Sequence, residues 1–276
     1  MRVTLRRIQR LSPNHLWRTL LKLATWNVNS LTVRLPHVLD WLAANQPDVL
    51  CLQETKQEDS KFPYAALQEA GFNAVHNGQK TYNGVAIISP HPLNDVHLDL
   101  PNFADEQKRI IAATIQGVRV ICAYVVNGQA LDSDKYQYKL NWLAALQNWV
   151  TDELKQHEKL ALLGDYNIAP DDRDCHDPVA WEGQVLVSQP ERDAFQQLLA
   201  LGLHDSFRLF NDEAGQFSWW DYRMAAFRRN MGMRIDHILV SDALQALCQS
   251  CVIDKAPRKL ERPSDHTPVM LTLTNA

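Results

Sequence analysis

Five short polar clusters in this chain hold residue types that can do chemistry, and each stands at or just past the end of an apolar run. They are residues 26–29 (WNVN), 52–56 (LQETK), 164–167 (GDYN), 234–237 (RIDH) and 264–266 (SDH). If the apolar runs are strands, they deliver these groups to one rim of a sheet. Carboxylates that converge there without matching bases repel one another and require a cation, most simply Mg²⁺. With His266 added, the pattern indicates a metal-dependent hydrolase of phosphate esters.

Each candidate residue also has a plain structural interpretation. A single glutamate such as Glu54, after the apolar run 49–52, is most often a surface residue. Asp165 and Asn167 can act as local caps of a turn. If the backbone stays extended, they instead project to the same side and hold a water, with Asp165 taking its proton and Asn167 orienting it. Taken together, the clusters favour the catalytic interpretation.

The chain contains two Asp-His steps, at Asp236 and at Asp265. In the strand predicted over residues 235–240, alternation places Asp236 and His237 on opposite faces. We therefore predict a structural role for His237 and a chemical role for His266, whose basicity nearby carboxylates would raise.

Composition sets the broad class. A chain of 276 residues with 46% hydrophobic content can bury one large core or two modest ones. No linker rich in Pro, Gly or Ser and no block of charge divides it, so we expect one domain. Its net charge of −4 argues against a surface that coats nucleic acid indiscriminately, although a local basic rim remains open. No apolar stretch approaches the ~20 residues that span a bilayer. The five cysteines, including the pair Cys248 and Cys251, are predicted to be buried thiols of a cytoplasmic protein rather than a redox or zinc half-site.

The first twenty residues stand apart, because they hold five arginines and no acidic residue. A transit peptide has such a composition. We favour the alternative that the true start lies near Leu21, where strand-like sequence begins. In either case, residues 1–20 are expected to be a poorly ordered basic extension, and residues 21–276 a single domain.

Helices and strands alternate in the expected order. Strands are predicted at 22–26, 48–52, 72–76, 84–89, 109–115, 118–126, 159–163, 235–240, 251–254 and 269–273. Helices are predicted around residues 35–42, with Pro36 in the first turn, and at 62–70, 135–154, 191–201 and 242–246, while 101–108, 127–134, 170–190 and 211–233 are expected to be loops. Hairpins mixed with helices favour an α/β fold of two mixed β-sheets packed face to face with helices outside.

From about Lys22 to its C-terminus, the chain resembles the exonuclease III family of DNA-repair nucleases, in the exonuclease–endonuclease–phosphatase superfamily. Most of the five clusters are shared with much of that superfamily. The segments 217–223 (FSWWDYR) and 232–236 (GMRID) point to exonuclease III itself. The resemblance implies a four-layer αβ-sandwich and a Mg²⁺ or Mn²⁺ cofactor. It also implies a monomer that acts on double-stranded DNA with abasic sites or blocked 3′ ends, as a 3′→5′ exonuclease, 3′-end-cleaning enzyme or abasic-site endonuclease.

The resemblance also implies roles for individual residues. The metal would be held by or lie beside Asn27, Glu54, Asp165, Asn167, Asp265 and His266. The catalytic groups would be Tyr124 on the phosphate and Asp165 and Asn167 on the water. His266, oriented by Asp236, would bind the scissile phosphate or share in proton transfer. Substrate would contact Asn127 and a base-less-sugar pocket of Trp219, Met233 and Ile235.

Several positions depart from the family pattern. Val126 replaces a usual proline, Met233 replaces a bulkier residue, and the loop 171–190 matches poorly. Leu186 stands where relatives carry a small residue, so we expect 3′-end processing to exceed abasic-site incision. The rival interpretations are an inositol phosphatase or phospholipase of the same superfamily, and a non-catalytic DNA-binding module.

Overall fold

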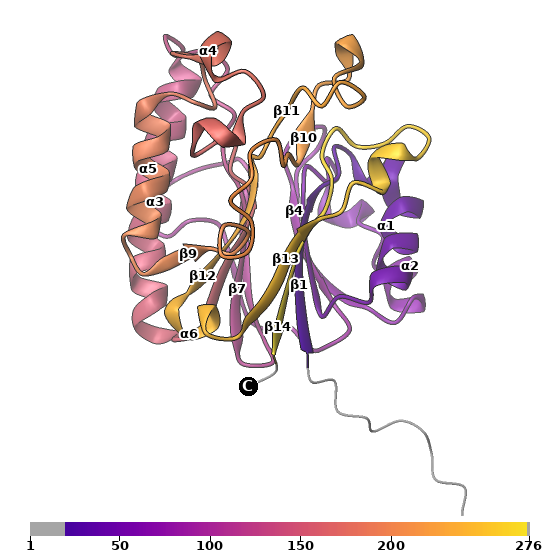
Figure 1. Cartoon of the computed structure of the whole chain (residues 1–276). Helices are drawn as coiled ribbons and strands as arrows, with labels where there is room; N and C mark the ends of the chain where they lie inside the picture. Colours follow the sequence, from indigo (N-terminus) through magenta and orange to yellow (C-terminus); the bar gives the residue numbers. More distant parts are fainter. Residues whose placement is uncertain (1–19, 275–276) are drawn as a thin grey trace, which may run out of the picture.

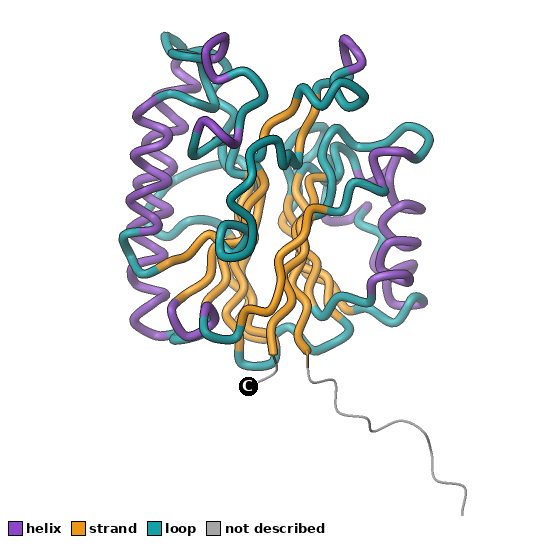
Figure 2. The backbone as a smooth tube through the Cα atoms, in the orientation of Figure 1, coloured by secondary structure: helices purple, strands orange, loops and turns teal. Residues whose placement is uncertain are grey.

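The computed structural model describes residues 20–274, which form two six-stranded sheets packed face to face with helices on both outer sides (Figures 1 and 2). This arrangement confirms the predicted four-layer α/β sandwich. The predicted basic extension lies outside the described residues except for Leu20, which already belongs to the first strand.

Both sheets are mixed and share one plan. The first has the order β13 (Cys248–Ile253), β14 (Val269–Thr274), β1 (Leu20–Asn27), β2 (Val49–Gln53), β4 (Val85–Ser89) and β3 (Asn73–Asn77). The second has the order β5 (Asn94–Leu98), β6 (Ile110–Ile115), β7 (Val118–Tyr124), β8 (Leu160–Asp165), β12 (Asp236–Ser241) and β9 (Leu203–Asp205). In each sheet the two central strands, β1–β2 or β7–β8, form the parallel pair. The carboxyl ends of all four central strands lie at one rim of the sandwich.

Three apolar layers hold the sandwich together. Residues such as Cys51, Ile87 and Leu163 fill the space between the sheets. Helices α1 (Leu31–Asn45) and α2 (Tyr64–Glu69) cover the outer face of the first sheet, and α3 (Asp134–Gln156) and α5 (Gln189–Leu199) cover that of the second (Figure 1). The remaining helices, α4 (Pro178–Trp181) and α6 (Asp242–Gln245), are single turns. Short 3-10 turns occur at Asp59–Lys61, Asp172–Asp174, Arg223–Ala225 and Pro257–Lys259.

The structure corrects the predicted elements at several places. Strands β5 and β9 and the ribbon of β10 (Trp219–Trp220) and β11 (Gly232–Met233) were not predicted, and neither was helix α4. Helix α1 begins at Leu31, so Pro36 lies inside the helix instead of in its first turn. The expectation that residues 211–233 form only a loop is wrong, because β10 and β11 lie within them. This ribbon matters for the site, since it carries Trp219 and Met233.

The cysteines are free thiols, as predicted, although Cys248 is only half-buried. Within residues 20–274, no helix has the length and apolar character needed to cross a membrane.

Candidate active site

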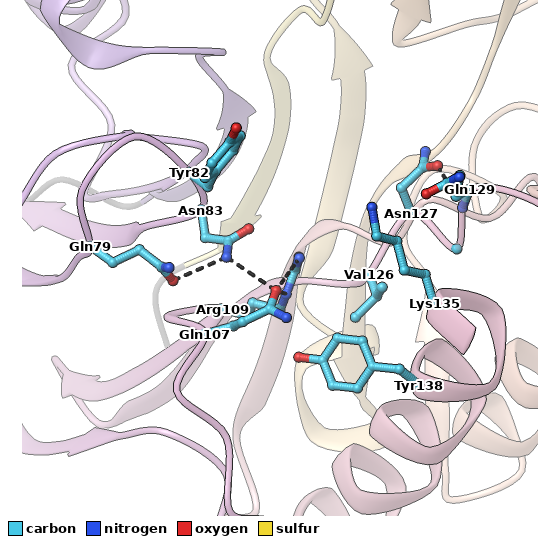
Figure 3. A pocket seen from close by; sticks show the side chains of 11 residues that line it. Gln79, Tyr82, Asn83, Gln107, Arg109, Val126, Asn127, Gln129, Lys135 and Tyr138 are labelled. Carbon is cyan, nitrogen blue, oxygen red and sulfur yellow. Dashed lines mark hydrogen bonds between the residues drawn. The ribbon is translucent and has the colours of Figure 1, made fainter. Parts of the chain in front are cut away.

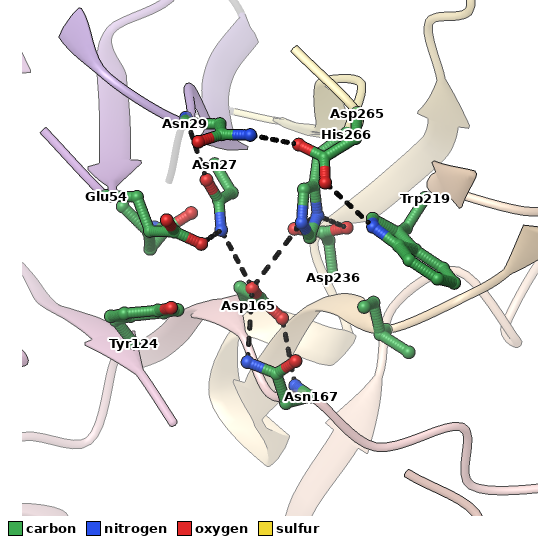
Figure 4. Close-up of polar contacts among 12 residues, drawn as sticks. Asn27, Asn29, Glu54, Tyr124, Asp165, Asn167, Trp219, Asp236, Asp265 and His266 are labelled. Atoms are coloured by element: carbon green, nitrogen blue, oxygen red, sulfur yellow. Dashed lines mark hydrogen bonds and ion pairs between the residues drawn. The ribbon is translucent and has the colours of Figure 1, made fainter. Parts of the chain in front are cut away.

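The polar clusters converge at the rim where the central strands end (Figure 4). Asn27, Tyr124 and Asp165 are the last residues of β1, β7 and β8, and Glu54 directly follows β2. Asp236 is the first residue of β12, which runs antiparallel to β8 and therefore starts at the same rim. Both sheets thus contribute to one site.

Asn27 joins the two sheets at the centre of this site. Its Nδ2 donates to Oε1 of Glu54 at 2.9 Å and to Oδ2 of Asp165 at 2.9 Å. Its Oδ1 accepts a hydrogen bond from the backbone N–H of Asn29 at 3.0 Å. The amide therefore holds the two carboxylates together, and its role as a metal ligand stays a prediction.

The donor set fits a divalent cation. One ligand atom from each of Glu54, Asp165 and His266 lies within 4.8 Å of the other two. Burial raises the pKa of the Asp165 carboxyl. The charge of His266 lowers this pKa in part and the charge of Asp236 raises it again, so the pKa reaches about 7. Neighbouring carboxylates repel each other when both are ionised, and a bound cation removes this repulsion. Hard oxygen ligands are those that Mg²⁺ and Mn²⁺ prefer.

Lys56 supplies a positive charge beside this cluster. Its Nζ lies 2.9 Å from Oε2 of Glu54 and donates to Oδ1 of Asn29 at 2.6 Å. Burial raises the pKa of Glu54, but the charge of Lys56 and the hydrogen bond from Asn27 lower it more, so the carboxyl is held ionised. Glu54 is thus available as an anionic ligand at neutral pH.

Asp165 and Asn167 form a closed turn rather than an extended pair. Asn167 has a φ of 50°, and its backbone N–H donates to Oδ1 of Asp165 at 2.9 Å. Its Nδ2 donates to the carbonyl of Val125 at 3.0 Å, and its Oδ1 accepts from Nδ2 of Asn127 at 3.1 Å. The backbone from Asp165 to Asn167 is thus not extended, whereas the sequence-based prediction assumed an extended backbone. The side chains of Asp165 and Asn167 are still neighbours, because the turn brings Asn167 back to the Asp165 carboxylate.

Asp236 fixes the orientation of His266. Oδ2 of Asp236 lies 2.9 Å from Nδ1 of the imidazole and accepts a hydrogen bond from Oγ of Ser218 at 2.6 Å. Burial alone would lower the pKa of His266, but the charges of Asp236 and Asp165 raise it to about 10. The second ring nitrogen, Nε2, lies 3.7 Å from Oδ2 of Asp165 and is directed into the site.

His237 lies on the other face of β12, as the alternation predicted. Its Nε2 pairs with the carbonyl of Ile168 at 2.9 Å, and its Nδ1 lies 3.1 Å from the guanidinium of Arg234. Burial and the Arg234 charge lower its pKa to about 4, so the ring is neutral. Its Nδ1 must then accept from Arg234 while Nε2 donates, and both nitrogens are occupied away from the site.

Asp265 lies beside the cluster of Glu54, Asp165 and His266, and other groups hold its carboxylate. Oδ1 accepts from Nδ2 of Asn29 at 2.9 Å, and Oδ2 accepts from the indole N–H of Trp219 at 3.1 Å. Its place in the metal shell therefore stays a prediction. What the structure adds is that Asp265 orients the Trp219 ring.

A small apolar cluster borders the site on the Trp219 side. Met233, Ile235 and Leu186 are buried in it, and the half-buried Trp219 packs against them. The three predicted pocket residues are thus brought together, and Leu186, from the poorly matched loop, joins them. Leu186 has a φ of 79°, a conformation that costs a residue with a side chain of order 1–3 kcal/mol.

A pocket of about 710 Å³, with both polar and apolar lining, lies on the Tyr124 side (Figure 3). Its lining includes Arg109, whose guanidinium carbon lies 4.7 Å from the centroid of the Tyr124 ring, together with Lys135 and Asn127. Burial and the charge of Glu54 raise the pKa of Tyr124 well above its usual value, so its hydroxyl stays protonated as a donor. The wall also includes the amide side chains of Gln79, Asn83, Gln107 and Gln129 and the less polar side chains of Tyr82, Val126 and Tyr138 (Figure 3).

Comparison with known proteins agrees with this geometry. The model of the endonuclease/exonuclease/phosphatase family matches residues 24–266. The chain belongs to this family. It is 36% identical over 263 residues to exodeoxyribonuclease III of Haemophilus influenzae, with 90% of this chain and 98% of the relative covered.

Two solved structures resemble the fold closely. The 3′ phosphatase NExo from Neisseria, solved with a product DNA hairpin, has a TM-score of 0.91 and 54% identity, covering 92% of this chain and all of that one. An AP endonuclease from Archaeoglobus fulgidus has a TM-score of 0.90 and 38% identity, covering 93% of this chain and all of that one. These comparisons confirm the predicted family and the predicted class of enzyme, a DNA-repair nuclease.

Sequence reasoning missed several residues that shape the site, among them Asn29, Lys56 and Ser218. Asn29 and Lys56 stand inside predicted clusters, two residues after Asn27 and Glu54, so their spacing was a usable signal. Ser218 stands in the segment 217–223 that points to the family, but its contact with Asp236 had no signal in the spacing, because these two residues are 18 apart in the sequence.

Proposed function

We propose that the protein is a Mg²⁺-dependent phosphoesterase that cleans and shortens the 3′ ends of duplex DNA, with incision at abasic sites as a weaker activity. The observation that carries this proposal is the position of the Glu54, Asp165 and His266 cluster, between an apolar cluster on one side and a cationic, amide-lined pocket on the other. A nucleic-acid strand bound across the rim would present a phosphate to the cluster.

Each residue of the site has a task in this proposal. Glu54 and Asp165 would hold the cation, which supplies positive charge to the phosphate oxygens. Asp165, kept in place by the N–H of Asn167, would take a proton from the attacking water that Asn167 orients. His266, fixed by Asp236, and the Tyr124 hydroxyl would donate to the phosphate as negative charge develops on it.

The two flanking surfaces suit the two sides of a cleaved strand. The apolar cluster of Trp219, Met233 and Ile235 suits a sugar without its base. The pocket with Arg109 and Lys135 suits the negatively charged backbone on the other side. We propose that the enzyme acts as a monomer in the cytoplasm, with Mn²⁺ able to replace Mg²⁺.

The test is a product gel with three defined duplexes, carrying an internal abasic site, a recessed 3′ end or a 3′-phosphate. We expect 3′-phosphate removal and exonuclease products to dominate, and excess EDTA to abolish all three activities. An inositol phosphate and sphingomyelin serve as competing substrates. Faster hydrolysis of either one would favour a different phosphoesterase of the superfamily, and undiminished DNA processing in EDTA would reject the metal mechanism.

A further inference from the structure

A fully buried lysine lies directly behind the site. Lys139 is on the inner face of α3, and its side chain has no exposed surface. Its Nζ donates to the carbonyl of Asn167 at 2.7 Å and to the carbonyl of Asn127 at 3.2 Å, and it forms an ion pair with Glu191 at the start of α5. One ammonium thus fixes the backbone of the water-orienting turn and of the loop at the phosphate.

The Glu191 carboxylate also accepts hydrogen bonds from a third segment of the chain. Oε1 accepts from the backbone N–H of Leu186 at 3.0 Å. Oε2 accepts from the backbone N–H of Ser188 at 3.1 Å and from its hydroxyl at 2.5 Å. The carboxylate therefore holds the segment before α5, including Leu186 in its strained backbone conformation.

These contacts connect three functional parts of the site. Asn167 orients the water, Asn127 lies at the cationic pocket, and Leu186 forms part of the apolar cluster with Met233. A charged pair with no solvent exposure is costly to bury, and replacing it by apolar residues is often neutral or stabilising. Stability alone therefore gives a weak reason for its presence, whereas the need to align three segments gives a specific one.

We propose that Lys139 and Glu191 are positioning residues that set the distance between the water-orienting turn at Asn167 and the Leu186 side of the apolar cluster. This distance determines the preference of the enzyme for a 3′ terminus over an internal abasic site. This inference rests on the proposed DNA-processing function. Without Glu191, the Leu186 segment relaxes from its strained conformation. The apolar cluster then becomes wide enough to accept a continuous DNA strand.

The central test is Glu191→Gln, which keeps the size of the side chain but replaces one acceptor oxygen by a donor. We expect the ratio of abasic-site incision to 3′-phosphate removal to rise at least about fivefold, because the relaxed Leu186 segment admits a continuous DNA strand and a shift of ~1 Å can change a rate by ~10²-fold. The ratio is independent of the fraction of active protein. In the Leu186→Gly background, Glu191→Gln should add little further change, because both act on the same segment.

The chain offers a matched control on the same helix. Arg119 and Glu153 form another buried ion pair, with 2.5 Å between Nε and Oε2, near the opposite end of α3. Glu153→Gln should lower thermal stability and leave the substrate ratio unchanged. An unchanged ratio in Glu191→Gln, an equal change in Glu153→Gln, or additive effects of Glu191→Gln and Leu186→Gly would overturn the proposal.

A second measurement is independent of activity. Hydrogen exchange at the Leu186 and Ser188 amides should become faster in Glu191→Gln and stay unchanged in Glu153→Gln. Unchanged protection in both variants would contradict the positioning role even if the wild type proved active. Conversely, a wild type inactive on all three duplexes would reject the proposed function, while the exchange data would still decide whether Glu191 holds this segment.

Discussion

Asp165 and Asp236 lie directly opposite each other on the antiparallel strands β8 and β12, and the His266 ring lies between their carboxylates. Asp236 occupies Nδ1 and leaves Nε2 toward Asp165 and the site. The register of two strands therefore decides which nitrogen of the histidine faces the candidate site, and we propose that this nitrogen meets the substrate. A shift of one residue would direct the carboxylate of Asp236 to the opposite face of its sheet.

Replacing Asp165 by asparagine should separate folding from chemistry. The amide keeps the size of the side chain but cannot take a proton from water, and losses of a single general base typically cost ~10²–10⁴ in rate. We expect kcat on the 3′-phosphate duplex to fall by that range, with an unchanged circular dichroism spectrum. A variant that keeps more than a tenth of the wild-type kcat would contradict this role.

Glu54→Ala should behave differently, because Glu54 is proposed to bind the cation rather than to move a proton. We expect the Mg²⁺ concentration for half-maximal activity to rise, and excess Mg²⁺ to restore part of the rate. The comparison with Asp165→Asn in the same titration is the control. If both variants had the same defect and neither recovered, the division of roles between the two carboxylates would be wrong.

The cationic pocket predicts a salt effect on binding. Lys135 is exposed and lines this pocket, so Lys135→Gln should remove about one phosphate contact. The slope of log Kd against log salt for a duplex with a 3′-phosphate, measured in EDTA, should become less steep by ~0.9. Lys155, exposed at the far end of the same helix, is the matched control. Equal slopes for Lys135→Gln and Lys155→Gln would place the strand elsewhere.

His237 predicts a specific loss of stability in acid. Its folded pKa of about 4 lies below the ~6.5 of an exposed histidine, so the unfolded chain binds the extra proton between these values. Stability is therefore full above pH 6.5 and falls as the pH drops toward 4. From pH 7 to pH 5, the free energy of unfolding should fall by about 2 kcal/mol more in the wild type than in His237→Gln. Urea unfolding at both pH values measures this, and parallel losses would contradict the assignment.

The site residues that lie at the ends of regular strands could be predicted from the sequence. Glu54 and Asp165 follow apolar runs, so their convergence at one rim followed from the runs themselves. The separation of Asp236 from His237 followed from the two-residue period of a strand. These predictions needed only local periodicity.

Features made by irregular backbone or by distant packing could not be predicted in the same way. The β10 and β11 strands are two residues long and carry no period, so the partnership of Trp219 with Asp265 left no pattern. The burial of Lys139 has a signal in the sequence, since Lys139 lies on the same buried face of α3 as Trp142 and Leu143. Its partner Glu191 belongs to a capping box with Ser188, a signature present in the sequence. What the sequence could not supply was that these two charges meet.

The choice between a terminus and an internal site should depend on Leu186. This residue is 5% exposed, and it packs with Met233 and Ile235 in the cluster proposed to receive the base-less sugar. Placing an internal abasic site there requires bending and unstacking of a continuous duplex, which costs a few kcal/mol, whereas a free 3′ end deforms more easily. A bulky wall therefore penalises the internal site more. The flexible side chain of Met233 adds to this effect, because it adapts to neighbours rather than holding the strand open.

Leu186→Gly should reverse much of this preference, since glycine removes the wall and adopts a positive φ without strain. We expect the ratio of abasic-site incision to 3′-phosphate removal, from initial rates, to rise about tenfold. Leu186→Ala is the control, because it removes most of the bulk but keeps a Cβ at the same backbone angle. A rise in both variants assigns the effect to bulk, and a rise in glycine alone assigns it to the backbone. Faster incision than 3′-phosphate removal by the wild type would show that Leu186 does not restrict the site.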